Sequence, residues 1–414
     1  MTTDGPARAA SDPPEDIRAG APISAVPLAQ GCGWFEVFRE GTQYFALADT
    51  AARYWVALGP SAAPAGSRIR LQGTVSNARY FSLHVYDRAL QSRDALADFE
   101  IDTRGGLGNP YRSEVRVDAL RLGAPRFTAE VLLDAAAIPD SPNVLLMGET
   151  PAANGVPGAV LMYRAYVPAQ VELPTLELVT PAGTSPLPAA NSVDDCRRER
   201  DRLRAVYLDP PPTEPPRTPA DTVPTFRVFR GALGQGEGLL INRHNAYLFA
   251  LTERQPGRAL IVRGRAPTFT DDGRLLGLLG DADMRFWSLC QNSLQATPVP
   301  GCVSDFNAQL DNAGFFTVVI SDPADEPRAL TTRRDVNWLP WGVDPRGFPA
   351  YRHLLPDPDF AHAVQRVAPG QSAAAVMQSY YPRASYCSTT QLNAAADQPL
   401  EEVFASCRQE LARP

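Results

Sequence analysis

A pentapeptide of arginine, two aromatic residues, serine and leucine occurs twice in the chain, as Arg79–Leu83 and as Arg285–Leu289. Other blocks recur around it in the same order: Phe35–Arg39 with Phe226–Arg230, Tyr54–Leu58 with Tyr247–Leu251, Asn143–Gly148 with Asn337–Gly342, and Tyr163–Arg164 with Tyr351–Arg352. An ordered repeat with a spacing of roughly 190 residues indicates two copies of one structural unit. The chain must therefore fold as two domains that share an architecture.

The repeated blocks have the pattern of β-strands. In the first pentapeptide block, Phe81, Leu83 and Val85 share one face of the strand, and polar side chains occupy the other face: Tyr80, Ser82, His84 and Tyr86. This period of two is typical of strands with one buried face. Because such runs recur every dozen or so residues between Gly, Pro, Asn and Asp, we predict an all-β protein with two tandem antiparallel β-sandwich domains.

The limits of the repeat define the predicted domain organisation. We expect a disordered segment at 1–30, a first β-sandwich at 31–180, a helical connector at 181–209, a proline-rich linker at 210–224, a second β-sandwich at 225–382, and a tail with a helix at 383–414. A short helix thus follows each copy. The glycine-rich run 231–238 (GALGQGEG) is predicted to be a hairpin turn, because it lacks the lysine of a phosphate-binding loop.

Composition excludes several classes of function. The net charge of −7 argues against a nucleic-acid partner, which favours a basic surface. Lysine does not occur in the sequence, so Schiff-base chemistry and a P-loop are excluded. The 40 prolines suit a loop-rich β protein. No apolar run is long enough to predict a transmembrane segment.

Six cysteines suggest three disulfides: Cys290 with Cys302, Cys387 with Cys407, and Cys32 with Cys196. Six unrelated buried thiols are the alternative. None of the spacings is C-x-x-C, so no metal site is predicted. Disulfides favour an extracytoplasmic location, either secreted or in the cell envelope. The first 30 residues contain no apolar signal-peptide core, and we interpret such a signal as absent or removed.

Catalytic signatures do not stand out. The four histidines have no metal-ligand spacing, and no cofactor is predicted. Ser82 and Ser288 lie within strands, where a nucleophile would lack an exposed turn. The acidic clusters are better explained as solvated turns: Asp98, Glu100 and Asp102, and Asp281 and Asp283.

Aromatic residues of the second copy are the best candidates for ligand contact. Trp338 and Trp341, with Tyr351 and Arg352, offer ring faces and a charge that suit sugars or apolar groups. Packing in the core is the alternative for the aromatic side chains. The repeated Arg164 and Arg352 are candidates either for an anion site between the copies or for a repeated internal salt bridge.

Three motifs of the second copy resemble a family of known fold: RFWSL at 285–289, GFFTVVISDP at 314–323 and VNWLPWG at 336–342. They are similar to the domain of unknown function 1214 family, over roughly Arg285 to Pro356. The resemblance implies a jelly-roll-like β-sandwich, often in exported bacterial proteins, and brings no catalytic residues. The chain departs from the family pattern at Trp341-Gly342 and in having Cys290 and Cys302.

These observations favour a non-catalytic exported or envelope-associated protein that binds a glycan, a lipid or another protein through paired β-sandwiches. The alternative is a hydrolase or lyase that acts on a polymer or lipid in an inter-domain cleft. Fold class alone does not separate the two functions.

Overall fold

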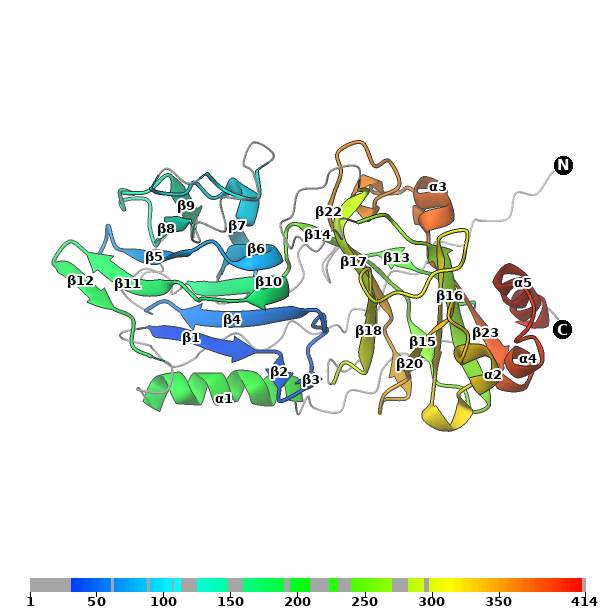
Figure 1. The fold of residues 1–414 in the computed structure, drawn as a ribbon. Helices are drawn as coiled ribbons and strands as arrows, with labels where there is room; N and C mark the ends of the chain where they lie inside the picture. Colours follow the sequence, from blue (N-terminus) through cyan, green and yellow to red (C-terminus); the bar gives the residue numbers. More distant parts are fainter. Residues whose placement is uncertain are drawn as a thin grey trace, which may run out of the picture.

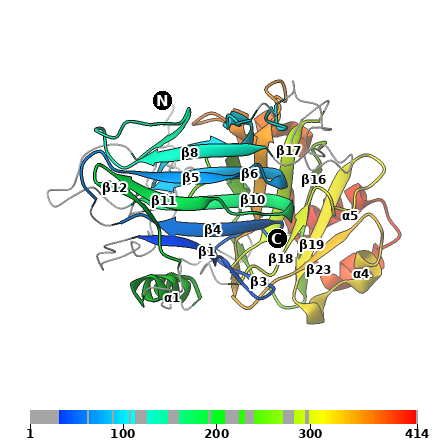
Figure 2. The ribbon, with the colours of Figure 1, turned by 60° about the vertical axis from the view of Figure 1, so that its left-hand side comes forward.

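The computed structural model describes residues 31–60, 63–87, 90–105, 108–112, 125–147, 159–189, 194–208, 223–229, 240–269, 282–293 and 298–411. The chain is divided below into a first half, residues 31–208, and a second half, residues 223–411. Figures 1 and 2 show the two halves side by side, with the strands of one half running across those of the other. The predicted turn at 231–238, the segment 1–30 and most of the linker 210–224 lie outside the described residues.

Two five-stranded sheets form the first half. One contains, in spatial order, β1 (Cys32–Val37), β4 (Ala52–Leu58), β10 (Val160–Gln170), β6 (Asn77–Tyr86) and β7 (Ser92–Ala97). The other contains β12 (Gly183–Pro186), β11 (Thr175–Thr180), β5 (Arg68–Thr74), β8 (Arg126–Leu132) and β9 (Asn143–Leu146). A small ribbon of β2 (Arg39–Glu40) and β3 (Gln43–Tyr44) and the 3-10 turn η1 (Asp98–Glu100) complete it.

The second half is also built on two main sheets. One contains β13 (Arg227–Val228), β14 (Asn245–Phe249), β22 (Ala350–Pro356), β17 (Met284–Gln291) and β18 (Gly301–Ser304). The other contains β20 (Asn337–Pro340), β19 (Phe315–Ser321), β16 (Arg258–Arg265) and β23 (Arg383–Ser388), and a ribbon joins β15 (Thr252–Glu253) to β21 (Arg346–Gly347).

The strand orders of the two halves correspond. The order β1-β4-β10-β6-β7 in the first half is matched by β13-β14-β22-β17-β18 in the second. The repeated pentapeptides lie in β6 and β17, which hold the same position in these two sheets. The sequence repeat is therefore accompanied by a repeated strand order, and the protein is all-β as predicted.

One pair of strands in each half is parallel, which the prediction of antiparallel sheets did not include. The strands β8 and β9 are parallel, as are β19 and β20. In both cases the connection crosses back to the starting end of the strand before the next strand begins. The second crossing includes the short helices η3 (Pro323–Asp325) and α2 (Arg328–Thr331).

Helices lie at the outer sides of the sheets. The helix α1 (Asp194–Leu208) lies beside β1, and the disulfide Cys32–Cys196 joins the two (Figure 1). The helices α4 (Thr389–Ala394) and α5 (Leu400–Leu411) cover the side of the second half that faces away from the first, where Cys387–Cys407 ties α5 to β23. The remaining short helices are η4 (Val364–Arg366), α3 (Ala373–Met377) and η5 (Gln378–Tyr380). Among the described residues, no helix has the length and apolar character needed to cross a membrane.

The polar face of β6 is buried, although its pattern suggested contact with solvent. Phe81 and Leu83 point into the core of the first half, whereas Tyr80 belongs to a separate cluster that also contains Phe286 of the second half. His84 on the same face as Tyr80 is 1% exposed. The side that is normally left to solvent in a half-buried strand is thus covered by the other half of the chain.

A polar interface as the candidate functional site

Two arginine–aspartate pairs cross the interface in opposite directions. Arg79 in β6 contacts Asp305 after β18, with 2.5 Å between Nη1 and Oδ1, and Arg285 in β17 contacts Asp98 after β7 at the same distance. Each aspartate also accepts a backbone N–H, from Phe81 in the first half or from Trp287 in the second. Each half therefore supplies one arginine and one aspartate, in equivalent positions.

These ion pairs are buried. The side chains of Asp98 and Asp305 are inaccessible to solvent, and those of the two arginines are at most 5% exposed. Burial raises the pKa of both carboxyl groups, to about 7 for Asp305, although the neighbouring arginine acts against that rise. Because a buried ion left without its partner is costly, these pairs fix the arrangement of the halves.

A second pair of arginines reaches across the interface to loop carbonyls. Arg352 of β22 donates from Nη2 to the Leu47 carbonyl oxygen at 2.5 Å, and Arg164 of β10 donates to the Leu240 carbonyl oxygen. Leu47 and Leu240 have φ values of 58° and 52°. Side chains of this size rarely adopt positive φ, at a cost of order 1–3 kcal/mol. Both leucines thus have the same uncommon φ angle where the arginine binds.

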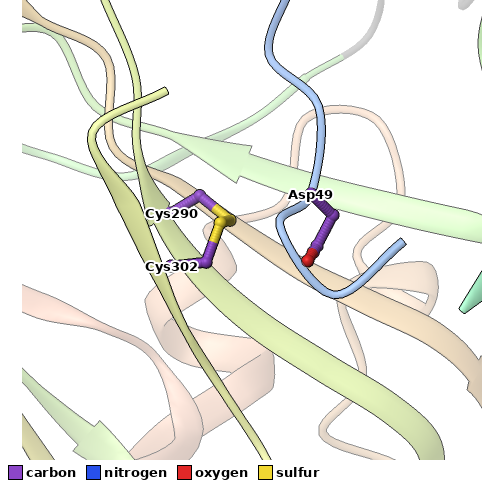
Figure 3. A group of neighbouring side chains, drawn as sticks. All are labelled: Asp49, Cys290 and Cys302. Atoms are coloured by element: carbon purple, nitrogen blue, oxygen red, sulfur yellow. A yellow bond between two sulfur atoms is a disulfide. The ribbon is translucent and has the colours of Figure 1, made fainter. Parts of the chain in front are cut away.

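Asp49 lies beside the disulfide Cys290–Cys302 (Figure 3), and both contact Arg352. Asp49 Oδ2 accepts from the Ser288 hydroxyl at 2.5 Å and from Arg352 Nη1 at 3.3 Å, and Arg352 Nη1 lies 2.7 Å from Cys290 Sγ. Potential metal-ligand atoms of Asp49 and both cysteines lie within 4.8 Å of one another. Both sulfurs are joined in the disulfide, which leaves no thiolate to bind a cation. The cluster connects the halves and carries no metal-ligand set.

The matching cluster around Arg164 contains a serine and a histidine that resemble a catalytic pair. Ser82 Oγ lies 3.1 Å from His84 Nδ1, and the backbone N–H of Arg243 donates to His84 Nε2 at 3.3 Å. Since Nε2 accepts a hydrogen bond, the ring proton lies on Nδ1 and is donated to Ser82. Burial, followed by the charge of Arg164, lowers the pKa of His84 well below its usual value. In this tautomer His84 has no free nitrogen to take the serine proton.

The predicted ligand residues lie in different environments. Trp341 is 4% exposed, and its indole N–H donates to the Asp344 carbonyl oxygen. Tyr351 is fully buried in the core of the second half, and Arg352 is 3% exposed at the interface. Trp338 is half-buried beside the cluster under α5 and donates to Ser321 Oγ. A stacking surface at Trp341 or Tyr351 is therefore absent, because both rings are covered by protein.

The residue of the first half that corresponds to Trp341 is buried as well. Met147 aligns with it, is 2% exposed, and follows β9 as Trp341 follows β20. The backbone N–H of Met147 bonds to Leu132, and that of Trp341 bonds to Ser321. Both side chains fill the same part of their sandwich.

The aspartates that define the interface, Asp98 and Asp305, were not predicted as site residues from the sequence. Asp98 was interpreted as part of a solvated turn, which is wrong, because its side chain is fully buried. A signal was present: Asp98-Phe99 and Asp305-Phe306 are the same dipeptide after equivalent strands. Each phenylalanine ring also lies beside the arginine that pairs with its aspartate. All three predicted disulfides are present, which confirms the cysteine pairing.

Comparison with known proteins gives structural neighbours without an assigned function. No protein-family model and no curated protein matches the chain. An uncharacterised protein from Burkholderia cenocepacia is similar in structure, with a TM-score of 0.50 and 14% sequence identity, over 87% of this chain and 83% of that one. The VPA0106 protein from Vibrio parahaemolyticus gives a TM-score of 0.38 at 11% identity, over 82% of this chain and 90% of that one. The first similarity concerns the fold alone.

Proposed function

We propose that this is a non-catalytic exported or envelope-associated protein that binds a glycan, a lipid or another protein through its paired β-sandwiches. The proposal rests on the contacts of the buried carboxylates, which pair with arginines across the interface. Asp98 and Asp305 are both bound to an arginine of the other half, and Asp49 is bound to Arg352. Groups that an enzyme would use at a cleft instead hold the two halves together as one rigid scaffold.

The proposed location rests on the disulfides. One ties β1 to α1, one joins β17 to β18, and one ties β23 to α5. Bonds of this kind persist in oxidising compartments, and the similarity of three motifs to a family common in exported proteins agrees with that location. We also propose that the halves are tandem copies of one domain. The matching strand orders and the crosswise arginine–aspartate pairs support this origin.

An enzymatic function at the interface is the weaker interpretation. The alternative of a hydrolase or lyase needs a nucleophile or a general base in contact with substrate. Among the described residues, Ser82 and His84 most resemble such a pair. Both are buried, and His84 donates to Ser82 and so cannot take its proton. The proposal of binding is therefore preferred.

A binding screen with the intact chain tests the proposal. Purified protein would be applied to glycan arrays and to phospholipid vesicles, and turnover of polysaccharides and lipid esters would be assayed in parallel. We expect saturable binding without turnover, and Trp338→Ala should weaken glycan binding with little change in the melting temperature. Trp341→Ala is the matched control, because loss of this buried ring should lower the melting temperature. Turnover that disappears in Ser82→Ala would contradict the proposal.

A further inference from the structure

The two arginines that reach across the interface differ in what neutralises them. Arg352 has the carboxylate of Asp49. The residue equivalent to Asp49 in the second half is Asn242, which has no charge to offer Arg164. The equivalence is structural, because Asp49 Oδ1 accepts the N–H of Ala51 and Asn242 Oδ1 accepts the N–H of His244, each two residues later.

The amide of Asn242 has a fixed orientation. Its Oδ1 accepts the His244 N–H at 3.0 Å and the Tyr80 hydroxyl at 3.2 Å. Its Nδ2 therefore takes the place that Oδ2 of Asp49 takes in the other cluster, where that oxygen receives Ser288 and Arg352. An acceptor on one side of the interface is replaced by a donor on the other.

Two donors are consequently left without an acceptor. Asn242 Nδ2 and Arg164 Nη1 are buried atoms with no hydrogen-bond partner among the described residues. Asn242 is 2% exposed and Arg164 is 3% exposed. The matching atoms in the Asp49 cluster, Oδ2 and Arg352 Nη1, are in direct contact. A negative atom in contact with both donors would satisfy them.

No carboxylate of the described residues forms an ion pair with Arg164. Its guanidinium lies over the ring of Tyr86, 5.6 Å from the centroid, and the nearby carboxylate of Glu100 lies 3.8 Å from His244 Nε2. Burial and then Arg164 lower the pKa of His244 to about 4, so its ring is neutral at physiological pH. An isolated buried guanidinium is unfavourable unless an anion accompanies it.

We propose that a small monovalent anion of the size of chloride binds in contact with both Arg164 Nη1 and Asn242 Nδ2. It supplies to Arg164 the negative charge that the carboxylate of Asp49 supplies to Arg352. Two buried donors that lack an acceptor among the described residues, one of them on a guanidinium, make a site for a single negative atom. A bound anion would thereby complete the second cross-interface arginine contact.

The site can be tested by exchanging anions at constant ionic strength. The melting temperature of the intact chain would be measured while sodium gluconate, whose anion is too large for the site, is replaced by sodium chloride. We expect a saturating rise of about 2–4 °C in chloride. Equal melting temperatures in both salts would overturn the proposal, because a water molecule would then satisfy the two donors.

Three variants show which residues cause the rise in melting temperature in chloride. Asn242→Asp recreates the Asp49 arrangement, so it should be at least as stable in gluconate as the natural chain is in chloride, without further response. Asp49→Asn is the matched control on the other side and should add a second chloride response. If Asn242→Asp or Asp49→Asn fails to fold, Arg164→Met still tests the site, because it should abolish the chloride response. A response that persists in Arg164→Met would place the anion elsewhere.

Crystals grown in gluconate and soaked in bromide give a direct observation. An anomalous peak between Arg164 Nη1 and Asn242 Nδ2 is expected, and it should be absent in Asn242→Asp. A peak without stabilisation in solution would mean binding at crystal concentration only and would contradict the proposal.

Discussion

The loop before β4 and the loop before β14 share one backbone feature and carry different charges. Each holds a leucine at positive φ whose carbonyl oxygen accepts an arginine from the opposite half. The first loop then supplies Asp49 to Arg352, and the second supplies Asn242 to Arg164. The arginine contacts that hold the halves together are therefore repeated, whereas the charge next to them is not.

The strands beside these loops differ in a related way. Cys290 of β17 is bonded to Cys302 on the neighbouring strand, whereas the equivalent position of β6 is His84, opposite Ala95. The disulfide side has a carboxylate, and the histidine side has an amide. The side of the interface with Asp49 therefore contains a disulfide and an ion pair, whereas the side with Asn242 is held by hydrogen bonds to neutral acceptors.

The largest effect is expected from breaking the contacts that both sides share. Asp98→Asn and Asp305→Asn each leave a buried arginine without its counter-charge, so each should lower the free energy of unfolding by about 3–5 kcal/mol. Chemical denaturation of the two variants measures the loss. In a double-mutant cycle, adding Arg79→Met to Asp305→Asn should recover part of it. Losses below about 1 kcal/mol in both variants would be typical of exposed pairs and would contradict the buried interface.

Removal of the disulfide that only the second half has should have the next largest effect. The double variant Cys290→Ala, Cys302→Ala releases a loop with a sequence separation of 12 residues, and we expect a loss of roughly 3 kcal/mol. Thiol titration of the denatured, unreduced natural protein should detect no free thiol. Detection of two or more thiols per chain would show that at least one pairing is incorrect.

A smaller effect is the difference in unfolding free energy between variants of Arg352 and Arg164. Arg352→Met leaves Asp49 buried with Ser288 as its remaining side-chain donor, which should cost about 3–5 kcal/mol. Arg164→Met leaves no described carboxylate unpaired, and its main loss is the donor to the Leu240 carbonyl oxygen, which we expect to cost about 1–3 kcal/mol. Denaturation of both variants in gluconate measures the difference. Equal losses would mean that the two clusters are not as different as their charges indicate.

A gradual effect of pH is expected from His353 in the second half. Burial lowers the pKa of His353 to about 3, and its Nδ1 accepts the backbone N–H of Val364. The unfolded chain binds a proton there below about pH 6.5, whereas the folded chain does not, so stability is lost as the pH falls from 6.5 toward 3.

His353→Asn keeps an acceptor for Val364 and removes the titration. The free energy of unfolding of the natural chain should therefore approach that of the variant by at most about 1.4 kcal/mol per pH unit between pH 6.5 and 4. Denaturation of both proteins across this range gives the difference, in which the other titrating groups cancel. A constant difference would mean that His353 is protonated in the folded chain.

The sequence predicted features that depend on local pattern or on the repeat itself. Alternation in β6 identified the core face formed by Phe81 and Leu83. The positions of the cysteines predicted two disulfides, and Cys32 was left as the possible partner of Cys196 in the third. The buried state of His84 could not be predicted in this way. A period of two distinguishes the two faces of a strand, but it does not indicate what covers the second face.

The crosswise ion pairs of the interface could not be predicted from local sequence patterns, for a different reason. Arg79 and Asp305 are 226 residues apart, and Arg285 and Asp98 are 187 residues apart. Each aspartate alone is indistinguishable from one in a solvated turn. Comparison of Asp98-Phe99 with Asp305-Phe306 identifies them as equivalent, but their partners depend on how the halves pack against each other.

Differential scanning calorimetry of the intact, oxidised chain shows whether the crosswise contacts join both halves into one cooperative unit. We expect a single transition, whose calorimetric and van't Hoff enthalpies agree, and which moves as a whole to lower temperature in Asp98→Asn. Two separate transitions, with only one of them shifted by Asp98→Asn, would show that the halves unfold independently and that the crosswise contacts do not couple them.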